Sequence, residues 1–395
     1  MQDEPLSLSE AARRAGVSPS TLKRWAEQGV IPEVSDGDGW TAAAAAHARI
    51  VARLRERGHS LDLIKAASKQ GRLAYGFVEE LFPGDREGRR IEEAAEETGL
   101  ETALIERFIS SIGLPATTLE HITDEDIHAL QYVAAVLGAG FPLVAFLQLC
   151  RVYGRALSQI ADAEVRLFHI YVHEPLMREG VPGLEMAEEM EHLARDLLPL
   201  ASPLMDYVHQ RFLHHYLEQD VVGHMEVELE GQELGRLRVA IAFADLAGYT
   251  RFTEEEGEEE ALSFVERFVE GVNGTLPENA RVIKTIGDEV MVVGQDAGAL
   301  TDWAVGFMKL FPDRPQPRIG LHYGGALYRD GDYYGREVNL VSRVVARARG
   351  GEVLVTDAIK DAVQEAGHLS FEGIGTVKLK GFDEPAQLFR ASARE

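Results

Sequence analysis

Two aspartates in the C-terminal part of the chain have the setting of a metal site. Asp245 ends the apolar stretch IAFAD, and Asp288 follows Gly287 at a tight turn between the apolar runs of VIKTIGDEVMVV. Carboxylates presented from a strand end and a turn suit a hard divalent cation that binds phosphates, either Mg²⁺ or Mn²⁺. The alternative for each aspartate alone is a simple turn cap.

Other polar residues follow at a spacing that places them on one helix face. Asn339 and Arg343 lie four residues apart in VNLVSRV, so a helix projects both side chains from the same side. The alternative is an exposed polar stripe on an amphipathic helix. Lys284 lies on the predicted strand before the Asp288 turn, and Asp332 lies in the segment GDYYG.

Alternating strand and helix patterns from residue 237 onward carry these side chains. Apolar runs predict strands at 236–246, 280–286, 289–293, 317–329 and 352–356, with helices around 258–272, 296–311 and 335–348. The order strand-helix-strand-strand-helix-strand predicts a ferredoxin-like fold with additions. Because the preceding half reads as mostly helical, the expected fold class of the whole chain is α+β.

Together, the segments IAFADLAGYT, VIKTIGDEVMVV and GDYYGREVNLVSR resemble, in order and spacing, the catalytic domain of class III nucleotidyl cyclases. The resemblance covers about residues 236–392. It implies an adenylate cyclase, a phosphorus-oxygen lyase that converts ATP to cyclic AMP and pyrophosphate. It also implies that Asp245 and Asp288, assisted by the Leu246 carbonyl, bind two Mg²⁺ or Mn²⁺ ions per site. One ion would activate the ribose 3′-hydroxyl for attack on the α-phosphate, and the other would neutralise the triphosphate.

The same resemblance implies roles for five further residues. Asn339 would orient the ribose, Arg343 would stabilise charge on the reacting phosphate, and Lys380 in VKLKGF would contact the triphosphate. Lys284 and Asp332 fall at positions that read the base. Adenine accepts a hydrogen bond at N1 and donates one at N6, so a lysine donor and an aspartate acceptor match ATP. Guanine presents the opposite pattern, which leaves a guanylyl cyclase as a minor alternative.

Members of this family form their sites between two catalytic domains, one of which supplies the metal aspartates and the other the remaining residues. The chain carries one complete set, so the resemblance implies a homodimer with two equivalent sites. Members with a soluble helical domain before the catalytic domain include mycobacterial-type adenylyl cyclases with autoinhibitory N-terminal domains. By this resemblance, residues 1–225 would control the approach of the catalytic domains.

Composition limits the remaining possibilities. A chain of 395 residues exceeds one ordinary core, and its net charge of −25 repels nucleic acid over long range. A single cysteine, Cys150, and a terminus without a secretory pattern lead us to expect a cytoplasmic protein.

The uncharged segment 133–150 approaches the length of a membrane span. Because Gly138, Gly140 and Pro142 interrupt it, we expect two buried helices joined by a break, with a bound lipid as the less favoured alternative.

Residues 6–32 have the pattern of a helix-turn-helix. Ser9 is expected to cap a first helix, and Ser18-Pro19 to start a second one that ends before Gly29. A DGDGW turn and a third helix at about 41–58 follow. The whole region resembles the winged-helix head of MerR-type regulators.

The same unit recurs further along the chain. Residues 11–32 align without gaps on residues 94–115, and after a one-residue shift Thr41 matches Thr123. We therefore predict tandem winged-helix-like units. Basic and acidic side chains balance over residues 1–80, whereas acidic ones dominate residues 86–147. DNA binding is thus not expected of the second unit and is the weaker alternative for the first.

The middle of the chain, from residue 142 to about 219, has helical periodicity. Pro199 and Pro203 predict that its later part divides into two helices. Two apolar stripes can serve as core or as a dimer seam. They comprise Ala156, Ile160, Ala163, Leu167 and Ile170, and then Met205, Val208, Phe212 and His215.

Seven histidines also gather in and just after this middle region. Their scattered spacing argues against a metal site. We hypothesise instead that acidification adds charge here and changes the coupling between the two halves of the chain. The histidines are His169, His173, His192, His209, His214, His215 and His224.

The predicted domains are a MerR-like unit at 1–80, a second winged-helix-like unit at 86–150, a helical regulatory and dimerisation region at 151–225, a linker at 226–236 and the catalytic domain at 237–395. The leading hypothesis is an adenylyl cyclase regulated through its N-terminal half by a proton or a lipid. The alternative is a DNA-binding MerR-like transcriptional regulator whose cyclase-like domain only senses a nucleotide. A sensor has no need of Asn339 and Arg343, which argues against it.

Overall fold

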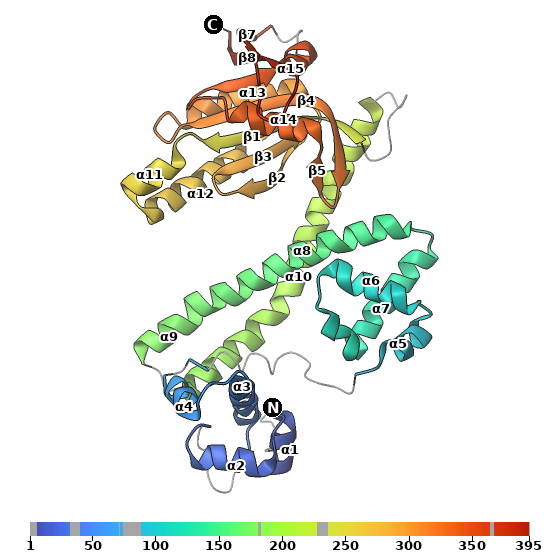
Figure 1. Ribbon diagram of the computed structural model, residues 1–395, viewed down its shortest axis with the longest axis vertical. Coiled ribbons are helices and arrows are strands. Elements are labelled where there is room, and N and C mark those ends of the chain that lie inside the picture. The colour runs from blue at the N-terminus through green and yellow to red at the C-terminus, as the bar shows by residue number, and fades with distance from the viewer. Residues whose placement is uncertain are drawn as a thin grey trace. The chain divides into compact units, whose positions relative to one another are not determined.

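The computed structural model describes residues 6–31, 40–70, 72–73, 88–180, 183–226, 236–363 and 367–394. The chain forms two compact units, Met1–Leu213 and His214–Glu395. The first unit is built from helices, and the second contains a mixed sheet with helices (Figure 1). The predicted α+β class is therefore confirmed. The predicted DGDGW turn, apart from Trp40, lies outside the described residues.

Four helices begin the first unit: α1 (Leu8–Arg14), α2 (Pro19–Glu27), α3 (Ala42–Glu56) and α4 (Leu61–Lys69). The predicted cap of α1 was wrong by two residues. Ser7 caps the helix, because its hydroxyl accepts from the Glu10 N–H while the Glu10 carboxylate accepts from the Ser7 N–H. Ser18 caps α2 as predicted, with Pro19 at the first helical position.

The predicted repeat is visible in the next helices, α5 (Ile91–Thr98), α6 (Thr102–Ile112), the short 3₁₀ helix η2 (Ala116–Glu120) and α7 (Asp124–Gly138). Each copy closes with an isolated backbone bridge just before its third helix. Leu6 pairs with Trp40 in the first copy, and Arg89 pairs with Ile122 in the second. Thr41 and Thr123 then cap α3 and α7 in equivalent positions. Two such copies share one local architecture.

Long helices follow: α8 (Leu143–Phe168), the π-helical turn η3 (His169–His173), α9 (Glu174–Glu179) and α10 (Gly183–Glu226). The predicted break between α7 and α8 is present at residues 139–142. The predicted division at Pro199 and Pro203 was wrong, because α10 continues through both. The two prolines are four residues apart, so their missing N–H groups and ring clashes fall on one helix face.

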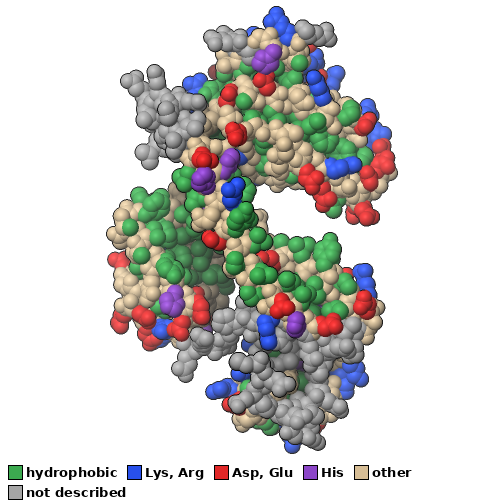
Figure 2. Space-filling model, turned by 180° about the vertical axis from the view of Figure 1, so that it is seen from behind, with side chains coloured by type: hydrophobic (Ala, Val, Ile, Leu, Met, Phe, Trp, Pro, Cys, Tyr) green, Lys and Arg blue, Asp and Glu red, His purple; other side chains and the backbone are tan. Residues whose placement is uncertain are grey.

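Large apolar side chains on α8 and α10 remain exposed in the single chain. Ile160, Leu167 and Phe212 are 39%, 54% and 54% exposed, and Leu200 and Leu204 are each 62% exposed. Hydrophobic side chains on the helical surface are visible in Figure 2. The apolar stripes therefore do not form an internal core of the isolated chain.

The strands described in the second unit form one eight-stranded sheet in the order β2-β3-β1-β4-β6-β8-β7, with β5 paired to β4. They are β1 (Arg236–Leu246), β2 (Ala280–Ile286), β3 (Glu289–Gly294), β4 (Pro317–Arg329), β5 (Asp332–Tyr334), β6 (Val353–Thr356), β7 (Leu369–Val377) and β8 (Ala386–Ala393). The antiparallel part β2-β3-β1-β4 is the ferredoxin-like arrangement, and β6, β8 and β7 extend it.

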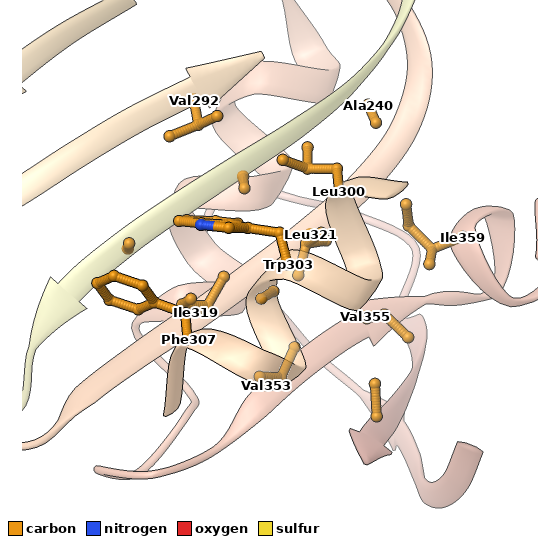
Figure 3. Close-up of a cluster of buried hydrophobic side chains, with 14 of the residues drawn as sticks. Ala240, Val292, Leu300, Trp303, Phe307, Ile319, Leu321, Val353, Val355 and Ile359 are labelled. Carbon is orange, nitrogen blue, oxygen red and sulfur yellow. The ribbon is translucent and has the colours of Figure 1, made fainter. Parts of the chain in front are cut away.

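Helices cover both faces of this sheet. They are α11 (Tyr249–Glu256), α12 (Glu258–Thr275), α13 (Ala297–Phe307) with the turn η4 (Met308–Leu310), α14 (Arg336–Val345) and α15 (Asp357–Ala362). Alternate residues of β1 pack against α12 and α13 on one face and against α14 on the other. Trp303 and Phe307 of α13 reach into the first of these cores (Figure 3). This sandwiched sheet fixes the strand ends and turns that carry the predicted site residues.

Candidate active site

Asp245 and Asp288 are brought together at one end of the sheet. Asp245 lies near the end of β1 and is almost fully buried, and Asp288 occupies the two-residue loop between β2 and β3. Gly287 takes the positive φ of 63° that the first position of such a loop requires. Burial, followed by the charge of Asp245 and a hydrogen bond with it, raises the pKa of Asp288 to about 6.

The chemistry of this pair fits a divalent cation. Burial and then the charges of Asp245 and Asp288 also raise the pKa of the adjacent Glu289, so negative charge is concentrated here. Within the described part of the chain, no group of three or more His, Cys, Asp or Glu side chains is arranged to hold a metal. Mg²⁺ typically binds through one or two carboxylates plus substrate phosphates. Asp245 and Asp288 provide the two carboxylates of such a set.

Arg318 is a site residue that sequence reasoning missed. It is the direct neighbour of Asp245 across the β1-β4 ladder, and its Nε donates to Asp245 Oδ2 at 2.8 Å. Its charge also lowers the pKa of Asp288, against the larger raising effects. Arg318 therefore lies beside the acidic pair, bonded to Asp245 and close enough to Asp288 to act on its charge. The register of β4 against β1 would have revealed it, but that register is a property of the fold.

Lys284 and Asp332, the residues predicted to read the base, contact each other in the structure. Lys284 Nζ donates to Asp332 Oδ2 at 2.6 Å, and the Tyr333 N–H donates to the other oxygen at 2.7 Å. Asp332 is held in place by a tight loop in which Asp330 and Gly331 both have positive φ. The two side chains come from β2 and β5, which are not paired in the sheet.

Asn339, Arg343 and Lys380 line one groove of about 880 Å³. Asn339 and Arg343 are exposed on the polar side of α14, while Val341 and Val345 on its other side are buried. Lys380 reaches the groove from the β7-β8 loop. Neither Asp245 nor Asp288 is among the residues that line it. In one chain, the acidic pair, Asp245 and Asp288, is thus separate from this groove, which we call the cationic groove after Arg343 and Lys380.

Leu246 has its side chain buried in the core below the sheet, as the predicted backbone role of this residue allows. No predicted site residue falls outside the described part of the chain.

Two family models match the chain. The model described as the adenylate cyclase regulatory domain matches residues 30–217, and the model described as the adenylate and guanylate cyclase catalytic domain matches residues 235–390. The protein is an adenylate cyclase with an N-terminal regulatory domain. The regulatory match spans most of both winged-helix-like units, whose MerR-like character stays a prediction.

Several proteins similar to this chain are named adenylate cyclases. The cyclase is 29% identical over 366 residues to the pH-sensitive adenylate cyclase MT1302 of Mycobacterium tuberculosis, a match that covers 90% of each chain. It is also 29% identical over 275 residues to an adenylate cyclase of Streptomyces coelicolor, covering 68% of this chain and 70% of that one. The crystal structure of the adenylyl cyclase CyaB from P. aeruginosa matches 42% of this chain and 98% of its own, with 22% identity and a TM-score of 0.38.

Among the described residues, none of the helices combines the length and apolar character needed to cross a bilayer.

Proposed function

We propose that the cyclase converts ATP to 3′,5′-cyclic AMP and pyrophosphate at two equivalent sites, each formed between the catalytic domains of a homodimer. The observation that carries the choice of ATP is the Lys284–Asp332 pair, because it places one donor and one acceptor side by side and adenine needs one of each. Separate placement of the acidic pair and the cationic groove supports a site completed by a second copy.

Each residue of the proposed site has its own role in the reaction. Asp245 and Asp288 bind the metal ions, with the Leu246 carbonyl assisting. The ions, Mg²⁺ or Mn²⁺, supply positive charge that acidifies the 3′-hydroxyl and neutralises the triphosphate. Arg343 lies on the exposed face of α14 and stabilises charge that develops on the α-phosphate. Asn339 orients the ribose one helical turn away, and Lys380 contacts the triphosphate from the same groove.

The helical half regulates the enzyme in this proposal. Exposed apolar side chains on α8 and α10 supply a dimer seam that brings two catalytic domains together. Regulation by protons is supported by the Mycobacterium tuberculosis relative, which is named a pH-sensitive adenylate cyclase, and by the histidines along these helices. Several of them face carboxylates, such as His192 with Asp196 at 3.5 Å and His214 with Glu218 at 3.5 Å. A lipid signal is the other candidate.

The test is an assay of the purified full chain with Mn²⁺ and either ATP or GTP. We expect cyclic AMP from ATP and a much lower rate with GTP. Lys284→Ala and Asp332→Ala should reduce this preference, because each removes one base contact. Comparing the full chain with residues 235–395 across pH then tests regulation. Identical pH profiles for the two would exclude proton sensing by the N-terminal half, and an inactive preparation with both nucleotides would refute the proposal.

A further inference from the structure

Tyr333 is a buried side chain placed directly beside the proposed base-reading pair. It is only 3% exposed, and its backbone N–H holds one oxygen of Asp332. Its hydroxyl accepts a hydrogen bond from Arg281 Nη2 at 3.0 Å. A buried hydroxyl without its partner would cost free energy, so this bond favours one position of the Tyr333 ring and of the loop that carries Asp332.

Arg281 also contacts the end of the long helix α10. Its guanidinium carbon lies 5.3 Å from the centre of the Tyr216 ring, within the range of a cation-π interaction. One turn further along α10, the Gln219 side chain donates to the Glu278 carbonyl, just before β2. Both contacts lie within the second unit, while α10 itself begins in the first. The helix that leaves the regulatory half is therefore attached to β2 close to Arg281.

From these contacts we infer that Arg281 is a positioning residue that links the end of α10 to the nucleobase pocket. One face of its guanidinium is covered by Tyr216, and one N–H fixes Tyr333 beside Asp332. A change in the position of α10 then alters the placement of Asp332 against Lys284. This inference rests on the proposed base-reading role of that pair.

Arginine suits this position better than lysine. The planar guanidinium can stack on an aromatic ring and still donate in its own plane, whereas an ammonium group has no such geometry. Arg281→Lys should consequently keep the charge but lose much of the link. A matched comparison exists on α12, where the Arg267 guanidinium lies 5.4 Å from the centre of the Phe264 ring, away from the base-reading pair.

The experiment measures kcat/KM of the full chain for ATP and for GTP. Arg281→Ala should lower the preference for ATP about three- to tenfold, the size expected for one lost hydrogen bond. Tyr333→Phe should act in the same direction. Tyr216→Leu should lower the preference when Arg281 is present and have no further effect in the Arg281→Ala background. Arg267→Ala should leave it unchanged.

Two results would overturn the link: an unchanged preference in Arg281→Ala, or an equal effect of Tyr216→Leu with and without Arg281. If Arg281→Ala does not fold, the pair Tyr216→Leu and Tyr333→Phe decides instead, since additive effects contradict a shared residue. Failure of the base-reading role itself is seen separately, as an unchanged preference in Lys284→Ala and Asp332→Ala.

Discussion

At the scale of single residues, the two aspartates of the proposed metal site lie in different electrostatic settings. Asp245 is paired with Arg318, whereas the pKa of Asp288 is raised to about 6 by burial and by the nearby Asp245 charge. An aspartate with a raised pKa is held in its charged form at a cost to folding. The two carboxylates should therefore respond differently to removal, although both serve the same proposed metal site.

We predict that Asp288→Ala abolishes cyclase activity and leaves the melting temperature unchanged or higher, because it removes like-charge repulsion. Asp245→Ala should also abolish activity but lower the melting temperature, because Arg318 loses its partner in a largely buried position. Activity assays and thermal unfolding of both variants provide the measurement. A lower melting temperature for Asp288→Ala than for Asp245→Ala would contradict this account.

The chemical roles of these residues were easier to predict from the sequence than the residues that contact them. Residue types and spacing, together with the resemblance to class III cyclases, were enough to nominate the residues that lie in the acidic pair, the Lys284–Asp332 pair and the groove. Arg318 escaped notice because its relation to Asp245 exists only across the β1-β4 ladder, between residues far apart in the chain. Arg281 and Tyr333 escaped for the same reason.

At the scale of elements, close packing of β4 on α14 positions the cationic groove. A Cβ added at Gly320 would lie 2.5 Å from the backbone nitrogen of Val345, so only glycine lets the helix approach this strand. We predict that Gly320→Ala destabilises the protein by about 1–3 kcal/mol and lowers kcat, because α14 must move with Asn339 and Arg343. Unfolding curves and steady-state kinetics measure both effects.

Gly306 provides the matched control for Gly320. It lies in α13, where an added Cβ meets nothing within 4 Å. Gly306→Ala should stabilise the helix by about 0.5–1 kcal/mol and leave kcat unchanged. If both glycine variants behave alike, close packing at β4 is not what positions α14.

His322 of β4 contacts both α14 and β6 through its ring nitrogens. Its Nε2 donates to the Glu337 carboxylate at 2.8 Å, and its Nδ1, lying 2.8 Å from the Thr356 hydroxyl, must then accept from it if the ring is neutral. Gly324 leaves the necessary space, because a Cβ there would lie 2.7 Å from Nε2. Burial lowers the pKa of His322 below 6.5, and this effect outweighs the opposing charges of Glu337 and Asp357.

A pH dependence of stability follows. Because folding lowers the pKa of His322, the unfolded chain takes up the proton first as pH falls. The contribution of His322 to the free energy of unfolding is therefore fully present above pH 6.5 and is lost as pH falls below it. We predict a smaller decline between pH 7 and 5 for His322→Gln, which keeps a donor but does not titrate. Thermal unfolding at each pH measures it, with the exposed His59→Gln as control. Equal declines in all three proteins would exclude His322 as the cause.

Element boundaries were predictable where the local signals agree. The apolar run at residues 236–246 gave β1 its observed bounds, and Ser18 caps α2 as expected. The single helix α10 was not predictable from Pro199 and Pro203, because a rule about one proline does not describe two placed on the same face.

At the scale of the whole molecule, the exposed apolar side chains of α10 are typical of a surface that a second protein chain covers. Leu197, Leu200, Leu204 and Val208 recur every three to four residues, and all are more than a third exposed. We predict that Leu200→Glu with Leu204→Glu converts the proposed dimer to a monomer and strongly reduces activity. Light scattering coupled to gel filtration measures the mass. Leu63→Glu, at an equally exposed leucine on α4, is the control that should remain dimeric.

The sequence could not determine the use of these stripes. Apolar periodicity marks a face that needs covering, but whether the cover comes from the same chain or from another copy depends on how helices pack. Exposure of the stripes in the single chain favours the second use. Whole-molecule organisation is thus the level at which the structure adds most to the proposed mechanism.

The central claim is that one copy supplies the metal aspartates and its partner supplies Arg343. Mixing Asp288→Ala with Arg343→Ala, each inactive alone, tests it most directly. In a mixed dimer, one site receives both intact halves, so re-associated equal amounts should recover roughly a quarter of wild-type activity. A mixture that exchanges subunits, verified by differently tagged chains, yet stays as inactive as its components would contradict the account.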